Sequence, residues 1–199
     1  LHDGIGWLED VPLLRASEIP LRGAHNIENV MAATLAAQIA GAAPSALASA
    51  LRGFPGVEHR IEFVRTLRGV DYFNDSKATS VDAALKAIDA FDAGLWIIRG
   101  GKDKNSDYTV TREALGRKAR VALLIGAAAP KIESQLRGAV PLLLCGTLDA
   151  AVAQAAREAK AGETVLLSPA CSSFDQFQSY EHRGRFFKEL VNGLTEGKG

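Results

Sequence analysis

Beyond residue 60 the sequence alternates short apolar runs with longer amphipathic stretches, and this alternation limits the possible folds more than any other feature. The runs have the length of buried strands, and the stretches between them repeat apolar residues at helical spacing. Such a pattern predicts an α/β fold with a mainly parallel sheet and helices on both faces. Strands are predicted at 61–67, 70–73, 95–98, 121–125, 141–144 and 164–167, and helices near 111–118, 128–136, 148–160 and 179–193.

The first quarter of the chain has a different pattern. Apolar spacing and alanine content predict one helix at 24–40 and a second at 45–51. The apolar pieces at 5–8 and 11–14 are interpreted as strands or loops without their partners. Residues 53–56 (Gly-Phe-Pro-Gly) have the composition of a linker, so we place a domain boundary there.

Composition excludes several classes of function. The 23 basic and 23 acidic residues balance, so neither a nucleic-acid partner nor a membrane partner is expected. No apolar run reaches the roughly 18 residues that a membrane-spanning helix needs. The two cysteines, Cys145 and Cys171, form neither a disulfide framework nor a CxxC metal pair. A cytoplasmic location is the expectation.

The start of the chain is also informative. It begins Leu1-His2-Asp3, and its single methionine is Met31. We expect from this start that the chain is part of a longer polypeptide, and a processed terminus is the alternative.

Residues whose side chains could bind a ligand or take part in a reaction follow three of the predicted strands. They occupy 74–79 after the strand at 70–73, 100–104 after the strand at 95–98, and 168–173 after the strand at 164–167. Ligands of parallel sheets bind beyond the carboxyl ends of the strands, and a helix start favours anions. The sequence therefore predicts a binding site where these three segments meet.

The first segment, Asn-Asp-Ser-Lys-Ala-Thr, has two interpretations. Thr79 and Asp82 form a T-x-x-D pattern, which is typical of a capped helix start. Capping leaves Asp75 and Lys77 unexplained. An aspartate at a strand end can accept hydrogen bonds from ribose hydroxyls, and a lysine can meet a phosphate or a carboxylate.

The other two segments are equally open. Residues 100–104 (Gly-Gly-Lys-Asp-Lys) match neither G-x-G-x-x-G nor the phosphate loop, and form either a tight turn or a close approach of backbone to a ligand. Residues 168–173 predict a stiff loop at a helix start, and the spacing of Phe174 and Phe177 is typical of a core. Without a G-x-S-x-G elbow a serine hydrolase is excluded, and Cys171 is expected to be inert.

Two further groups are candidates for binding. His59-Arg60 follows the linker, where an arginine is well placed to bind phosphate across an interdomain cleft. Asn26 and Asn29 share one face of a mainly apolar helix, so their amides need partners. Those partners are either a ligand or a neighbouring loop.

Taken together, these motifs resemble the Mur ligase family. The resemblance runs in order through residues 25–29, 54–60, 74–79, 100–101, 168–177 and 183–184, and it covers nearly the whole chain. It implies a three-domain enzyme, of which residues 1–56 are the tail of the central ATP-binding domain. Residues 57–199 are then the complete C-terminal domain, with a Rossmann-like fold. The resemblance is strongest to members that add D-glutamate to UDP-N-acetylmuramoyl-L-alanine in peptidoglycan synthesis.

The resemblance also implies a reaction. ATP phosphorylates the substrate carboxylate, and the amine of D-glutamate then displaces phosphate from the acyl phosphate. Mg²⁺ is required, with ligands expected mainly upstream of this chain and no metal ligand assigned within it. The protein is expected to be a monomer, and this chain alone is expected to be inactive.

Roles for single residues follow from the resemblance alone. It implies nucleotide contacts from Asn26, Asn29, His59, Arg60 and Asp75, with Arg60 on a phosphate. It implies a D-glutamate pocket formed by Thr79, Lys104, Ser173 and Phe174, with Tyr180 near it. Lys77 and Arg60 are the candidate catalytic residues.

Two alternatives remain open. One is another amino-acid ligase of the superfamily, for a different Mur step or for folate polyglutamylation. The other is a non-catalytic nucleotide-binding module.

Overall fold

The structure is a computed structural model that describes residues 5–8 and 11–195. It divides into two compact units, Leu1–Val57 and Glu58–Gly199, and each is described by itself. The division falls one residue after the expected 1–56 segment. Within the described ranges, no helix is long and apolar enough to cross a membrane.

The smaller unit combines a strand pair with two helices. Strands β1 (Ile5–Leu8) and β2 (Val11–Arg15) pair with each other antiparallel. The two apolar pieces expected to lack partners are therefore each other's partners. Helices α1 (Ala24–Ile39) and α2 (Pro44–Arg52) follow a short turn of 3-10 helix, η1 (Ala16–Glu18), and both lie where they were predicted. Residues 1–3 lie outside the described ranges.

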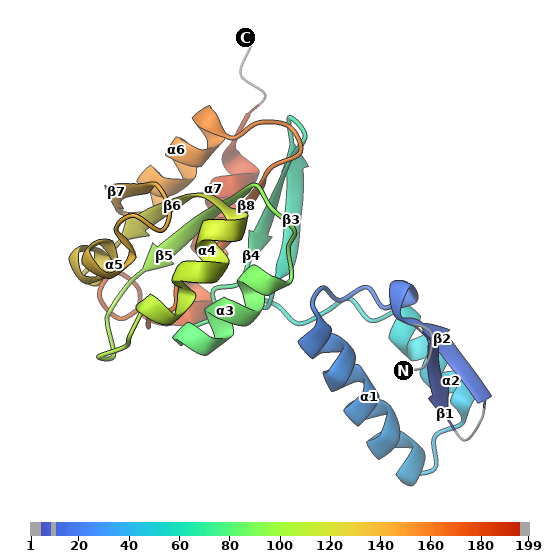
Figure 1. The fold of residues 1–199 in the computed structure, drawn as a ribbon. Helices are drawn as coiled ribbons and strands as arrows, with labels where there is room; N and C mark the ends of the chain where they lie inside the picture. Colours follow the sequence, from blue (N-terminus) through green and yellow to red (C-terminus); the bar gives the residue numbers. More distant parts are fainter. Residues whose placement is uncertain (1–4, 9–10, 196–199) are drawn as a thin grey trace. The chain divides into compact units, whose positions relative to one another are not determined.

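The larger unit is an α/β domain built on a six-stranded sheet (Figure 1). Its strand order is β3-β4-β8-β5-β6-β7, in which β3 and β4 pair antiparallel and all other pairs are parallel. The mainly parallel sheet predicted from the alternation is thereby confirmed. The strands are β3 (Glu62–Leu67), β4 (Val70–Asn74), β5 (Leu95–Gly100), β6 (Ala119–Ile125), β7 (Leu142–Gly146) and β8 (Thr164–Leu167). The helices are α3 (Val81–Asp89), η2 (Thr109–Thr111), α4 (Arg112–Lys118), α5 (Ala129–Leu136), α6 (Leu148–Glu158) and α7 (Tyr180–Gly193).

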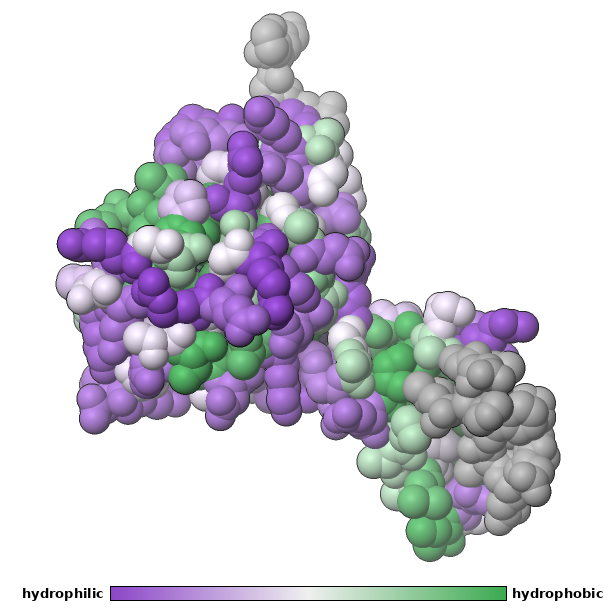
Figure 2. All heavy atoms as spheres, viewed as in Figure 1, coloured by the Kyte–Doolittle hydropathy of each residue, from purple (hydrophilic) through white to green (hydrophobic). Residues whose placement is uncertain are grey.

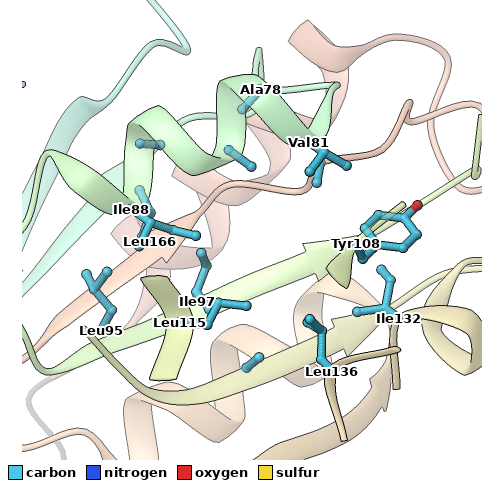
Figure 3. Close-up of a cluster of buried hydrophobic side chains, with 14 of the residues drawn as sticks. Ala78, Val81, Ile88, Leu95, Ile97, Tyr108, Leu115, Ile132, Leu136 and Leu166 are labelled. Carbon is cyan, nitrogen blue, oxygen red and sulfur yellow. The ribbon is translucent and has the colours of Figure 1, made fainter. Parts of the chain in front are cut away.

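Two hydrophobic cores hold this unit together, one on each face of the sheet. Helices α3, α4 and α5 cover one face, where Ile88, Ile97 and Leu115 are fully buried (Figure 3). Helices α6 and α7 cover the other, where Phe187 packs among strand residues. Successive side chains of a strand point to opposite faces of the sheet, so in β4 Tyr72 packs in one core and Phe73 in the other.

The face seen in Figure 2 is mostly hydrophilic, with apolar areas on both units. In the smaller unit, three large apolar side chains of α1 are exposed, Met31, Leu35 and Ile39, and Ile39 is 80% exposed. Their four-residue spacing places them on one side of the helix.

Candidate functional site

The three polar segments come together, as predicted, because they follow three neighbouring parallel strands. Strand β8 lies between β4 and β5, so residues 74–79, 168–173 and 100–104 leave the sheet at the same edge. Backbone hydrogen bonds join the segments, from Ala170 N to the Ala78 oxygen and from Lys102 N to the Ser172 oxygen, each at 2.9 Å. The middle loop is thus bonded to both of its neighbours.

Asp75 lies at the end of β4 and is the most perturbed acid of the site. Its carboxylate is 4% exposed and accepts hydrogen bonds from the Ser168 hydroxyl (2.9 Å) and from the amide of Ile61 (3.2 Å). Desolvation raises the pKa of Asp75 to about 7, although both hydrogen bonds and nearby Arg60 oppose the shift. Asp75 therefore titrates near neutral pH.

His59 is buried against Asn74, and its carbonyl oxygen accepts from Lys77 N at 3.1 Å, so it anchors the turn that carries Arg60. The residue is 2% exposed, and its Nδ1 lies 2.9 Å from the Asn74 amide nitrogen. Because the Asn74 oxygen accepts from Ser76 N, the amide nitrogen donates and Nδ1 accepts, which places the proton on Nε2. Burial lowers the pKa of His59, so the ring is neutral at pH 7. Arg60 itself is exposed.

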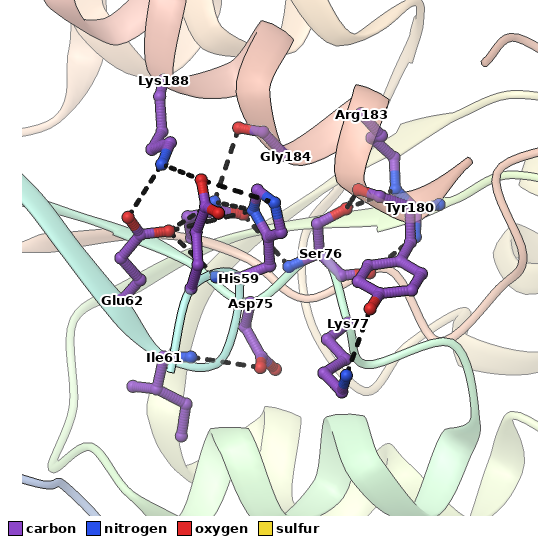
Figure 4. Close-up of polar contacts among 12 residues, drawn as sticks. His59, Ile61, Glu62, Asp75, Ser76, Lys77, Tyr180, Arg183, Gly184 and Lys188 are labelled. Carbon is purple, nitrogen blue, oxygen red and sulfur yellow. Dashed lines mark hydrogen bonds and ion pairs between the residues drawn. The ribbon is translucent and has the colours of Figure 1, made fainter. Parts of the chain in front are cut away.

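The ring of His59 packs directly against Gly184 of helix α7 (Figure 4). A Cβ at position 184 would overlap Nδ1 and lie 2.8 Å from Cε1. Gly184→Ala is therefore expected to destabilise the chain by about 2 kcal/mol through overpacking. The measurement is urea denaturation of the chain and the variant.

The same helix supplies a matched control. Gly193 has no atom within 4 Å of an added Cβ, so Gly193→Ala is expected to be neutral or up to about 1 kcal/mol stabilising, from helix propensity. Equal effects of the two substitutions would refute the steric explanation.

His59 is also one of three potential metal ligands that lie close together. Single ligand atoms of Glu58, His59 and Glu62 fall within 4.8 Å of one another. The Lys188 ammonium already lies between the two carboxylates, 2.7 Å from Glu58 and 2.9 Å from Glu62, and the Nε2 of His59 is protonated. The two carboxylates are thus already neutralised by a lysine, and the third group is a histidine nitrogen, whereas Mg²⁺ prefers oxygen ligands. The group therefore does not fit Mg²⁺.

Ser76 and Lys77 connect the turn to the start of helix α7. The Ser76 hydroxyl donates to the Tyr180 carbonyl oxygen (2.8 Å) and accepts from Nε of buried Arg183 (2.9 Å). Arg183 also donates to the carbonyl oxygens of Ser76 and Cys171. The Lys77 ammonium donates to the Tyr180 hydroxyl.

Two local predictions are wrong. The cap of helix α3 is Ser80, whose hydroxyl accepts from Ala83 N, so Thr79 is not the cap. Phe174 is 67% exposed and not part of the core. Helix α7 begins only at Tyr180, so Phe174 and Phe177 do not lie on a helix, although their spacing is helical. Both corrections leave Thr79 and Phe174 available to a ligand.

The loop after β5 presents Lys104 to solvent. A Cβ on Gly101 (φ 131°) would overlap the Ser172 carbonyl oxygen, so the two loops approach as closely as glycine allows. Asp103 then fixes the loop by accepting hydrogen bonds from Tyr108, Ser106 and Lys131. Desolvation raises the pKa of Asp103, and these three hydrogen bonds outweigh it and lower the pKa to about 2.

The remaining candidates divide between the two units. Ser173 is buried in the larger unit, and its carbonyl oxygen accepts from Phe177 N at 2.8 Å. In the smaller unit the buried Asn26 amide donates to the Arg22 carbonyl oxygen at 2.7 Å, which is the loop contact left open above. Exposed Asn29 donates to the Asn26 side chain.

Sequence reasoning gave no role to two buried arginines. Arg99 and Arg183 are both about 1% exposed or less, and desolvation lowers the pKa of each to about 10. Arg99 interrupts the apolar run of β5, which is a signal that could have been used. Arg183 gives no such local signal, because its acceptor Ser76 lies 107 positions away.

Comparison with known proteins identifies the class of protein that has this fold and these loops. Residues 59–171 match the family described as Mur ligase, glutamate ligase domain. The chain therefore belongs to the Mur ligase family.

Individual relatives narrow the comparison. The chain is 64% identical over 182 residues to the UDP-N-acetylmuramoylalanine–D-glutamate ligase of Solibacter usitatus, covering 92% of this chain and 41% of that protein. It is 56% identical over 180 residues to the ligase of the same name from Acidobacterium capsulatum, covering 90% and 39%. The chain thus spans about two fifths of the length of these curated relatives.

A solved structure agrees at the level of the fold. MurF ligase from Thermotoga maritima, in complex with ADP, superposes with a TM-score of 0.60 at 16% identity. The match covers 85% of this chain and 39% of that one.

Proposed function

We propose that this chain is the C-terminal part of a ligase that uses ATP to join D-glutamate to UDP-N-acetylmuramoyl-L-alanine. The observation that carries the proposal is the 64% identity, over 92% of the chain, to a relative named for that reaction. In the proposed reaction the substrate carboxylate attacks the γ-phosphate of ATP and releases ADP. The amine of D-glutamate then attacks the acyl phosphate, and the amide forms as inorganic phosphate leaves.

On the nucleotide side, we assign the ribose to Asp75. Its ionised carboxylate can accept hydrogen bonds from hydroxyl groups. Exposed Arg60 is assigned to a phosphate. The resemblance implies a nucleotide contact for His59 as well, and because this residue is buried we propose that it contributes by anchoring the Arg60 turn. The amides of Asn26 and Asn29 are assigned to the adenine, with Asn26 using the amide hydrogen that its bond to the Arg22 carbonyl oxygen leaves free. The ADP bound to the Thermotoga maritima MurF ligase supports a nucleotide in this fold.

On the amino-acid side, we assign D-glutamate to the loops after β4, β5 and β8. The substrate brings two carboxylates, which need a cation and several hydroxyl or N–H donors. Lys104 supplies the cation, and Thr79 and Ser173 supply hydroxyls. Phe174 and Tyr180 are proposed to border the pocket.

The proposal also assigns the two parts of this chain to domains and places the metal ligands upstream of it. Residues 1–56 are assigned to the tail of a central ATP-binding domain and residues 57–199 to the C-terminal domain. Mg²⁺ neutralises phosphate charge in phosphoryl transfer. Its ligands are assigned upstream, since the Glu58–Glu62 group does not fit them. We further propose a monomer in the cytoplasm.

The test compares two neighbouring lysines in the longer ligase. Lys104→Met is expected to raise the KM for D-glutamate about a hundredfold, because a carboxylate loses a charged hydrogen bond. Lys102→Met, a control two positions away that is also exposed, is expected to change this KM less than about twofold. The measurement is phosphate release that depends on D-glutamate and UDP-N-acetylmuramoyl-L-alanine.

The possible failures separate the alternatives. No ligation by the unaltered ligase would favour a non-catalytic module, and ligation of a different amino acid would favour another ligase of the superfamily. Equal effects of the two lysine substitutions would refute the assignment of Lys104.

A further inference from the structure

The side chain of Lys77 is held by a residue far away in the sequence. Its ammonium donates a hydrogen bond of 3.1 Å to the hydroxyl of Tyr180, 103 positions further along the chain. The ammonium also lies 5.0 Å from the centre of the Tyr180 ring (Figure 4). We propose that Tyr180 is a positioning residue, which fixes the Lys77 ammonium at the proposed active site. This inference rests on the proposed function.

Tyr180 is itself firmly placed. It is the first residue of helix α7, which Ser179 caps by accepting from His182 N. Its carbonyl oxygen accepts from the Ser76 hydroxyl at 2.8 Å, and its ring packs at nearly a right angle to the His59 ring, with 6.0 Å between the ring centres. The phenol is therefore a rigid support for a flexible lysine.

Lys77 gains from such support. A free lysine side chain explores many rotamers, and holding it in one of them costs conformational entropy. The contact with Tyr180 compensates for this cost before a ligand binds. Lys77 stands two residues from Asp75, on the proposed nucleotide side, and two from Thr79, on the proposed D-glutamate side. Tyr180 takes one of the three ammonium protons, and two remain for an oxyanion that forms between those ligands.

The hydroxyl makes this arrangement testable, because Tyr180→Phe keeps the ring and removes only the hydrogen bond. In the longer ligase, Tyr180→Phe is expected to lower kcat about tenfold and to change the KM for D-glutamate less than about twofold. In a Lys77→Met background the same change is expected to have almost no further effect on kcat. Equal losses in both backgrounds, or no loss in either, would overturn the proposal.

A second measurement does not depend on ligase activity. In the 199-residue chain labelled with ¹⁵N-lysine, the hydrogen bond is expected to slow proton exchange at the Lys77 ammonium. Tyr180→Phe is expected to speed this exchange severalfold without changing the unfolding midpoint, whereas Tyr180→Leu also removes the ring contact. Unchanged exchange in Tyr180→Phe would refute the contact. If the exchange responds but the unaltered ligase adds no D-glutamate, the proposed function fails while the Lys77–Tyr180 contact stands.

Discussion

The Asp75→Asn substitution is expected to stabilise the chain at pH 8 by on the order of 4 kcal/mol and to leave its stability near pH 4 almost unchanged. The reason is that burial raises the pKa of Asp75 from 3.8 to about 7. The folded state therefore holds this proton more tightly than the unfolded state. The resulting stability is fully present below about pH 4 and is lost as the pH rises through 7. Asparagine is neutral throughout and avoids that loss.

The measurement is the free energy of unfolding of the chain and the variant in urea, at intervals from pH 4 to pH 9. The difference is expected to grow up to about pH 7 and then to level off. Ser168→Ala removes a hydrogen bond that holds the pKa of Asp75 down, so it is expected to move the levelling point to higher pH. A difference that stays constant with pH would contradict the titration of Asp75 in this range.

The same substitution is expected to impair function. A neutral amide accepts a ribose hydroxyl less strongly than a carboxylate, so ADP binding by the longer ligase is expected to weaken about tenfold. Asp71→Asn, at the other end of β4, is the matched control and is expected to leave ADP affinity unchanged. A gain in stability together with a loss of affinity would mean that Asp75 is retained for binding.

The alternation of apolar runs and amphipathic stretches was enough to predict the architecture. Strand β8 was predicted with its observed ends, because the apolar run at 164–167 is bounded by polar residues on one side and Pro169 on the other. The order of the strands was not predictable from local pattern. That β8 lies between β4 and β5 depends on how helices α3 and α6 pack on opposite faces of the sheet.

The meeting of the three polar segments could be predicted because it follows from a general property of parallel sheets. Finer detail could not. Thr79 and Ser80 are adjacent hydroxyl residues, and local pattern does not decide which of them caps helix α3. The contacts from His59 to Gly184 and from Lys77 to Tyr180 join residues more than 100 positions apart, and only the packing of helix α7 brings them together.

The two buried arginines are expected to respond to the same substitution in opposite directions. Arg183 donates four hydrogen bonds, to Ser76 and to the Cys171 carbonyl oxygen. Arg183→Met leaves these acceptors unsatisfied and is expected to destabilise the chain by about 3 kcal/mol. Among the described residues, the side chain of Arg99 donates one hydrogen bond, from Nη1 to Thr111 at 3.4 Å, and its Nε and Nη2 have no partner.

Arg99→Met is therefore expected to stabilise the chain by about 2 kcal/mol, because it removes a desolvated cation and two unpaired donors while nearly conserving volume. Urea denaturation of both variants, with similar m-values, is the measurement. The pair controls for the loss of a large buried side chain, since both arginines are buried and both become methionine. If both variants were destabilised, Arg99 would have to be satisfied in solution by a buried water or anion, and its charge would then belong to the structure of the site.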